Sequence, residues 1–195
     1  MKYKIIYADP PWKYNDSGSE KSIDDHYKTM DTEDLIRLPV KDIADDDCAL
    51  FMWVTFPKLQ DGLRVMKDWG FEYKTVAFNF VKLNKDKLKP YMGMGMWTRS
   101  NSEICLLGVK GIPVRINADV QQVILSAKGE HSSKPHEAYV RIERLMGDLP
   151  RVELFARHRR SGWDALGNEV PNEVQKTIGE GSQTSSGVLV WTTKN

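Results

Sequence analysis

Several features that mark particular classes of protein are scarce in this 195-residue chain. Its two cysteines, Cys48 and Cys105, lie inside apolar runs, which favours buried reduced thiols over a disulfide or a metal site. Its four histidines show no metal-ligand spacing, so we expect no bound metal. The formal net charge is only +1, and no global basic field therefore indicates a nucleic-acid partner. Any such binding must use local patches.

Long hydrophobic runs are also missing. The first residues contain no apolar signal region, and no run approaches the length of a membrane span. We therefore expect a cytoplasmic protein with no membrane partner. The length predicts one domain, over residues 1–170. The composition turns polar over 171–195, where we expect a flexible tail in which 188–191 could dock as a short strand.

The apolar runs that are present alternate with helical patterns. Strands are expected over 4–8, 48–54, 71–81, 102–109, 120–125 and 151–155, and helices over 32–38, 59–69 and 135–145. Gly70 stands where a helix C-cap would lie, and Pro135 is expected as the first helical residue. This alternation predicts an α/β sandwich with a mostly parallel sheet and helices on both faces.

The first expected strand ends at Asp9-Pro10-Pro11-Trp12. Two prolines fix their own φ angles and push the preceding residues towards extended geometry, so the strand must end in a stiff turn. A carboxylate, backbone carbonyls without competing N–H groups and a large aromatic ring together favour a pocket for a planar ring that carries an amine. In open α/β sheets, ligands bind at this end of a strand. The alternative for Asp9 is a turn carboxylate that bonds its own backbone.

This tetrapeptide resembles the (Asp/Asn/Ser)-Pro-Pro-(Tyr/Phe/Trp) motif of amino-methyltransferases, in the form found in the MT-A70-like adenine-N6 methyltransferases. Further stretches follow the order of that family: His26–Met30, Leu50–Thr55, Trp97–Asn101, Leu107–Gly111, Lys134-Pro135, Glu153–Arg157 and Gly167-Asn168. The resemblance implies a Rossmann-like methyltransferase sheet in permuted order, with the catalytic strand first. It also implies S-adenosylmethionine as the cofactor.

The chemistry that the motif predicts concerns the exocyclic amine of adenine, a poor nucleophile because its lone pair is delocalised into the ring. The Asp9 carboxylate and the Pro10 carbonyl can accept its two N–H groups and free the lone pair for attack. Pro11 completes the catalytic turn, and Trp12 can stack on a flipped base. By resemblance, Tyr27 is a second aromatic residue near the pocket. Much of the acceleration would come from alignment, without a metal or a covalent intermediate.

The chain lacks the Phe-x-Gly-x-Gly loop of many methyltransferases. Gly93 and Gly95 do not replace it, since they do not lie between a strand and a helix. The resemblance instead implies a glycine-poor site in which Lys134 pairs the methionine carboxylate, Glu153 lines the pocket and others reach the ribose and adenine. The implied cofactor-binding residues are Asp9, Lys134, Glu153, Arg157, Asn168 and Glu169. Taken singly, each also fits an ordinary turn, a strand end or an exposed helix start.

Two polar loops are expected to meet the substrate. Residues 13–25 are expected to form a lid. The lysine-rich segment 82–89, followed by Met-Gly repeats, offers phosphate contacts, and Lys85, Trp97 and Arg99 are the substrate-binding candidates there. Arg159-Arg160 is a further phosphate candidate. A solvated charged loop is the ordinary alternative.

Together these residues predict an adenine-N6 methyltransferase that acts on DNA, in a bacterium or its phage. The preference for DNA rests on a chain that is nearly all catalytic domain, without zinc-finger cysteines or an RNA-binding module. The alternatives are the same reaction on RNA, a non-catalytic nucleic-acid-binding subunit, or a small-molecule amine as substrate. A homodimer and a separate recognition subunit both stay open as partners.

Overall fold

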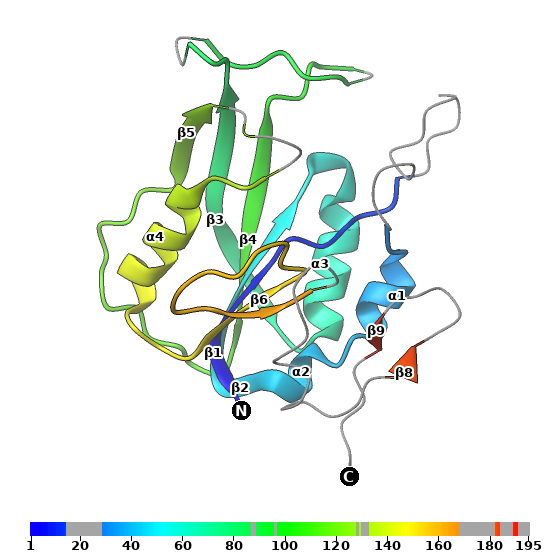
Figure 1. Ribbon diagram of the computed structural model, residues 1–195, viewed down its shortest axis with the longest axis vertical. Coiled ribbons are helices and arrows are strands. Elements are labelled where there is room, and N and C mark those ends of the chain that lie inside the picture. The colour runs from blue at the N-terminus through cyan, green and yellow to red at the C-terminus, as the bar shows by residue number, and fades with distance from the viewer. Residues whose placement is uncertain are drawn as a thin grey trace.

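A seven-stranded sheet forms the middle layer of the protein (Figure 1). The computed structural model describes residues 1–14, 29–86, 89–95, 97–127, 129, 133–167, 182–183 and 189–190. The strands of the sheet are β1 (Tyr3–Ala8), β2 (Ala44–Val54), β3 (Glu72–Leu83), β4 (Ser102–Lys110), β5 (Val123–Ala127), β6 (Arg151–Leu154) and β7 (Asp164–Leu166). Their spatial order is β5-β3-β4-β2-β1-β6-β7, so β1 lies inside the sheet between β2 and β6.

The strands run in one direction except for β4. β1 pairs in parallel with β2 and β6, β6 with β7, and β3 with β5, whereas β4 is antiparallel to both of its neighbours. The carboxyl ends of the other six strands therefore meet at one edge, which we call the carboxyl edge. The connection from β3 to β4 leaves from the same edge and projects beyond the sheet (Figure 1). The predicted Rossmann-like, mostly parallel sheet is confirmed.

Helices cover both faces of this sheet. The helices α1 (Thr32–Arg37), α2 (Val40–Ile43) and α3 (Leu59–Asp68) pack on one face, and α4 (His136–Met146) packs on the other (Figure 1). A short 3₁₀ turn, Phe56–Lys58, precedes α3. Because successive strand side chains alternate, Ile6 and Ala8 enter the core under α1–α3, whereas Ile5 and Tyr7 enter the core under α4.

Most of the expected elements are present, and the differences have local causes. Gly70 has a φ of 85°, but the C-cap of α3 is Trp69, so Gly70 lies one position past the expected cap, where a left-handed glycine commonly ends a helix. Pro135 is the N-cap of α4, with a ψ of 136°, so the expectation that it is the first helical residue is wrong. The helix α2 and the strand β7 were not expected, because elements of four and three residues are too short to show a periodic pattern.

Little of the C-terminal region lies in the described ranges. Ser182–Gln183 (β8) pairs antiparallel with Leu189–Val190 (β9), so part of the 188–191 segment does form a strand. The rest of the expected tail lies outside the described residues, and the domain boundary at 170 stays a prediction. None of the helices in the described ranges is long and apolar enough to cross a membrane.

Candidate active site

The stiff turn predicted at the end of β1 is fixed on both sides. The backbone N–H of Trp12 donates to the Pro10 carbonyl at 2.9 Å, and Met30 N–H donates to the Pro11 carbonyl at 2.8 Å. The Trp12 indole N–H donates to the Trp53 carbonyl at 3.1 Å. These contacts hold the residue after β1, Asp9, at the carboxyl edge and on the same side of the sheet as Tyr7.

Asp9 belongs to a chain of four charged side chains. Lys134 Nζ lies 2.8 Å from Asp9 Oδ2 and 3.2 Å from Glu103 Oε2. Lys82 Nζ donates to the other oxygen of the same carboxylate, Glu103 Oε1. The side chain of Lys134 is only 9% exposed, and its Nζ lies 5.7 Å from the centre of the Trp53 ring. Two cations and two anions thus compensate one another in a mostly buried place.

Burial and pairing shift the protonation equilibria of this chain in different directions. Burial raises the pKa of the Asp9 carboxyl, and the Lys134 ammonium opposes part of this rise. Burial would also raise the pKa of Glu103, but Lys134 and Lys82 together outweigh it and lower that pKa. Burial would lower the pKa of Lys134, but Asp9 and Glu103 outweigh it and raise that pKa. Glu103 and Lys134 therefore stay ionised at neutral pH.

An aromatic wall adjoins these charges under α4. The Trp53 indole N–H donates to the Tyr7 hydroxyl at 2.7 Å, and the Tyr7 ring lies 4.7 Å from the Tyr139 ring. Tyr139 in turn donates to Glu153 Oε1 at 2.8 Å. Burial raises the pKa of Glu153, and the hydrogen bond from Tyr139 opposes that rise. The guanidinium of Arg160 lies 3.8 Å from the centre of the Tyr139 ring and closes this wall.

The segment after β6 is held by two tight features. Phe155 has a φ of 63°, a left-handed conformation that is uncommon for a bulky residue. A Cβ on Gly167 would lie 2.2 Å from the Ala156 carbonyl oxygen, so only glycine permits the ends of β6 and β7 to come this close. The charge of Arg157 acts on the pKa of Asp9, which puts this segment beside the same site.

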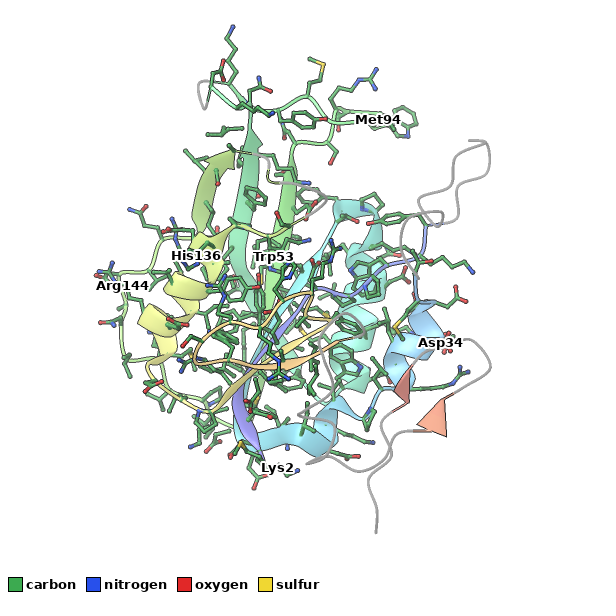
Figure 2. All side chains as sticks on the ribbon, in the orientation of Figure 1. Lys2, Asp34, Trp53, Met94, His136 and Arg144 are labelled. Atoms are coloured by element: carbon green, nitrogen blue, oxygen red, sulfur yellow. The ribbon has the colours of Figure 1, made fainter. Side chains whose placement is uncertain are left out.

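The structure brings together Asp9, Pro10, Pro11, Lys134, Glu153 and Arg157 among the predicted site residues. Trp12 lies beside them, but it is 6% exposed and packs in the core under α1–α3. Three of the predicted residues, Tyr27, Asn168 and Glu169, lie outside the described residues, as does most of the expected lid. Figure 2 labels Trp53 near the middle of the molecule and His136 at the start of α4.

The predicted substrate-binding loop is exposed and separate from the charged chain. Lys85, Trp97 and Arg99 lie on the projecting β3–β4 connection, with Trp97 96% exposed, and Figure 2 shows Met94 on this projection. A Cβ on Gly93 would lie 1.9 Å from the Ser100 carbonyl oxygen. The glycine therefore lets the two arms of the connection approach each other.

Three site residues were missed. Glu103 is the single charged residue classed as buried among those that the structure describes, and a glutamate inside an otherwise apolar strand was the available signal. Lys82 was grouped with the loop lysines, but it lies in β3 and pairs with Glu103. Tyr14 is half-buried, bonds Thr55 Oγ1 through its hydroxyl at 2.6 Å and lies 5.7 Å from Lys58 Nζ. Burial raises the pKa of Tyr14, and the charges of the site also act on it.

Fold and site together define a Rossmann-like methyltransferase. The MT-A70 family profile matches residues 3–169, and the chain belongs to the MT-A70 family. It is 36% identical over 191 residues to the type II methyltransferase M.MunI of Mycoplasma sp, covering 79% of that protein with 88% of its own length.

Two further relatives are much longer than this chain. One is the N(6)-adenosine-methyltransferase catalytic subunit METTL3 of Homo sapiens, which is 32% identical over 173 residues. That match includes 87% of this chain and 28% of the METTL3 protein. The other is the N(6)-adenosine-methyltransferase MT-A70-like of Arabidopsis thaliana, which is 31% identical over 172 residues. That match includes 86% of this chain and 24% of the Arabidopsis protein. The match is therefore to about a quarter of each of these two proteins.

Proposed function

We propose that this protein transfers a methyl group from S-adenosylmethionine to the N6 amine of adenine in DNA. The observation that carries the proposal is the Asp9 carboxylate at the carboxyl end of β1, next to the Pro10 carbonyl and ion-paired to Lys134 at 2.8 Å. Membership of the MT-A70 family and the name of the M.MunI relative support the reaction class.

The acceptors needed by an adenine amine are present at this turn. An Asp9 oxygen accepts one N–H of the amine, and the Pro10 carbonyl accepts the other. The Pro10 oxygen already accepts the backbone N–H of Trp12, but a carbonyl oxygen has two lone pairs and can accept a second donor. With both hydrogens held, the nitrogen lone pair would be directed at the methyl carbon. The N–C bond would form as the sulfonium C–S bond breaks, S-adenosylhomocysteine would leave, and one amine proton would pass to water.

The residues around Asp9 fit the chemistry of S-adenosylmethionine. That cofactor supplies an electrophilic methyl group on a sulfonium, and it carries a carboxylate, a ribose and an adenine. Lys134 is a cation suited to the carboxylate, and Glu153 is an acceptor suited to the ribose hydroxyls. The Tyr139 hydroxyl holds Glu153 Oε1 and leaves its second oxygen for the ribose. Arg157 reaches the same site and binds the nucleoside end.

Tyr14 is the better placed aromatic residue for stacking on the target base. The ring of Trp12 is buried and its N–H is engaged, so in this conformation it holds the turn rather than a base. Tyr14 follows the same turn, is half-buried and lies within the electrostatic influence of Asp9, Glu103 and Lys134. A base stacked on Tyr14 would lie near the charges of Asp9, Glu103 and Lys134. The exposed Lys85, Trp97 and Arg99 then contact the polynucleotide outside the pocket.

The relatives offer support for DNA and for RNA as the substrate. The relative that this chain matches over most of its length favours DNA. The term type II methyltransferase belongs to enzymes of DNA modification, and this chain covers 79% of that relative. The relatives named as N(6)-adenosine-methyltransferases favour the alternative, the same reaction on RNA, but the match covers about a quarter of each.

The test is transfer of labelled methyl from S-adenosylmethionine to four matched polymers, single- and double-stranded DNA and RNA, followed by nucleoside analysis. We expect N6-methyldeoxyadenosine from DNA and little product from RNA. Product from RNA alone would overturn the choice of polymer, and a methyl group on any other atom would overturn the reaction. Cofactor binding without transfer to any polymer would favour a binding subunit instead.

A further inference from the structure

Lys134 bonds one of the two oxygens of the Asp9 carboxylate, the acceptor that the proposed reaction needs. Its Nζ lies 2.8 Å from Asp9 Oδ2, well within hydrogen-bond distance. An ammonium at that distance draws electron density from the carboxylate and competes with an adenine amine for its lone pairs. The proposed function also assigns Lys134 to the carboxylate of the cofactor. Asp9 and the cofactor carboxylate thus compete for one buried cation, and the cofactor frees Asp9 for the substrate when it takes that cation.

We propose that Lys134 is a latch that orders the binding of the two substrates. Without cofactor, it holds Asp9 Oδ2 and weakens the carboxylate as an acceptor for the amine. When the cofactor binds, its carboxylate draws Nζ away, and Asp9 becomes available to the amine of adenine. This inference rests on the proposed function and adds to it an order, with the cofactor first and the nucleic acid second.

Glu103 keeps a carboxylate beside Lys134 during such a movement, and Lys82 stays on Glu103. Lys134 bonds Oε2 of Glu103 at 3.2 Å, and Lys82 bonds Oε1 of the same carboxylate. Lys134 can therefore leave Asp9 and still keep one carboxylate partner, while Glu103 keeps Lys82 throughout. Breaking a buried ion pair is costly when one charge is left uncompensated, and Lys134 keeps Glu103 as its partner when it leaves Asp9. The charge of Arg157, which lowers the pKa of Asp9, stays near that carboxylate. The Trp53 ring, 5.7 Å from Nζ, gives the ammonium a further favourable surface.

The latch predicts a measurable coupling between the two ligands. A ligand that carries a carboxylate into the site should raise the affinity for the polynucleotide, and by linkage the polynucleotide should raise the affinity for that ligand by the same factor. We expect a factor of about ten, which lies within the usual range for coupled sites.

The experiment compares two unreactive nucleosides on the unmodified protein. S-adenosylhomocysteine carries the amino-acid carboxylate, whereas 5′-methylthioadenosine has the same nucleoside without it. The dissociation constant of the oligonucleotide identified by the methyl-transfer assay is measured by fluorescence anisotropy with each ligand at saturation. We expect about tenfold tighter binding with S-adenosylhomocysteine and no change with 5′-methylthioadenosine. An equal gain with both, or no gain with bound S-adenosylhomocysteine, would overturn the latch.

A matched pair of variants in β3 tests the part played by Glu103. Lys82→Gln removes one of its two cations, so Glu103 holds Lys134 more strongly and the hold on Asp9 weakens. We expect the coupling to fall below about threefold. Lys74→Gln, on the same strand and paired with the exposed Glu72, should keep the full coupling. Full coupling in Lys82→Gln would contradict the inference. Failure of the proposed function looks different, because then no methyl transfer or no S-adenosylhomocysteine binding is seen.

Discussion

The two faces of the sheet are built from the same strands and carry different chemistry. Along β1, Ile6 and Ala8 enter the core under α1–α3, whereas Tyr7 and then Asp9 lie on the face under α4. Along β4, Ile104 and Leu106 enter the first core, and Glu103 and Cys105 lie on the second face. The first face holds a mainly aliphatic core, and the second holds the ion-paired chain and the aromatic wall.

This difference shows how one strand can contribute to both stability and chemistry, because its side chains alternate between the two faces. Side chains one residue apart point to opposite faces, so stability and chemistry are encoded in alternate positions. Neighbouring substitutions should therefore have different consequences. Those of the charged site residues on the α4 face should lower activity most, and those in the core under α1–α3 should mainly lower stability.

The largest expected effect comes from Lys134→Met on the α4 face. The methionine keeps the apolar stem and removes the cation, so the cofactor carboxylate loses its partner. We expect kcat/KM for methyl transfer to fall about 10²- to 10³-fold, the usual loss when one charged contact of a preorganised site is removed. Initial rates with labelled S-adenosylmethionine measure it. Lys67→Met, at an exposed position of α3, is the control and should match the unmodified protein.

Leu106→Ala should give the converse result on the α1–α3 face. Leu106 is fully buried, and removing three carbon atoms leaves a cavity in that core. We expect the free energy of unfolding to fall by about 2–5 kcal/mol, measured by urea denaturation. The kcat/KM of the folded protein should stay within about twofold of normal. A loss of kcat/KM as large as that of Lys134→Met would show that the two faces are not separate.

A smaller effect should appear in the pH dependence of stability. Lys134 and Lys82 lower the folded-state pKa of Glu103 below its unfolded value of about 4.3. The stabilisation is therefore present above pH 4.3 and is lost as the pH falls through the lower folded value. Between pH 6 and pH 3, the free energy of unfolding, measured by denaturation, should fall more steeply for the unmodified protein than for Glu103→Gln. Glu72→Gln, exposed in β3, should keep the steep loss. Parallel curves for all three proteins would contradict this pairing.

The smallest expected effect belongs to the rim of the aromatic wall. Arg160, which is half-buried, stacks over the buried Tyr139 ring at 3.8 Å, and such a contact contributes about 0.5–1 kcal/mol or somewhat more. We therefore expect Arg160→Gln to weaken S-adenosylhomocysteine binding by about two- to fivefold in calorimetry. Arg144→Gln, which removes an exposed pair with Asp119, should leave binding unchanged. Equal affinities for the two variants would remove Arg160 from the site.

The sequence predicts more of the fold than of the site. Long apolar runs and a capped α3 indicate their elements directly, and the resemblance to the MT-A70-like family correctly predicts the family and the parallel sheet. The pairing of Asp9 with Lys134 joins residues 125 positions apart, and no local pattern contains it. The role of Glu103 was not predicted because its partners, Lys82 in β3 and Lys134 before α4, are far from it in the sequence. The aromatic ring of Trp12 was expected to face a base, but the sequence does not show which core a ring after two prolines will enter.

The most direct test of the account is the methyl-transfer rate of Asp9→Asn, measured by nucleoside analysis of DNA. The substitution keeps the size and one carbonyl acceptor and removes the charge that holds the amine. We expect N6-methyldeoxyadenosine to form at least about 10²-fold more slowly than with the unmodified protein, while S-adenosylhomocysteine still binds. The control Asp68→Asn, exposed on α3, should be fully active. Unchanged transfer by Asp9→Asn would contradict the assignment of Asp9 as the acceptor.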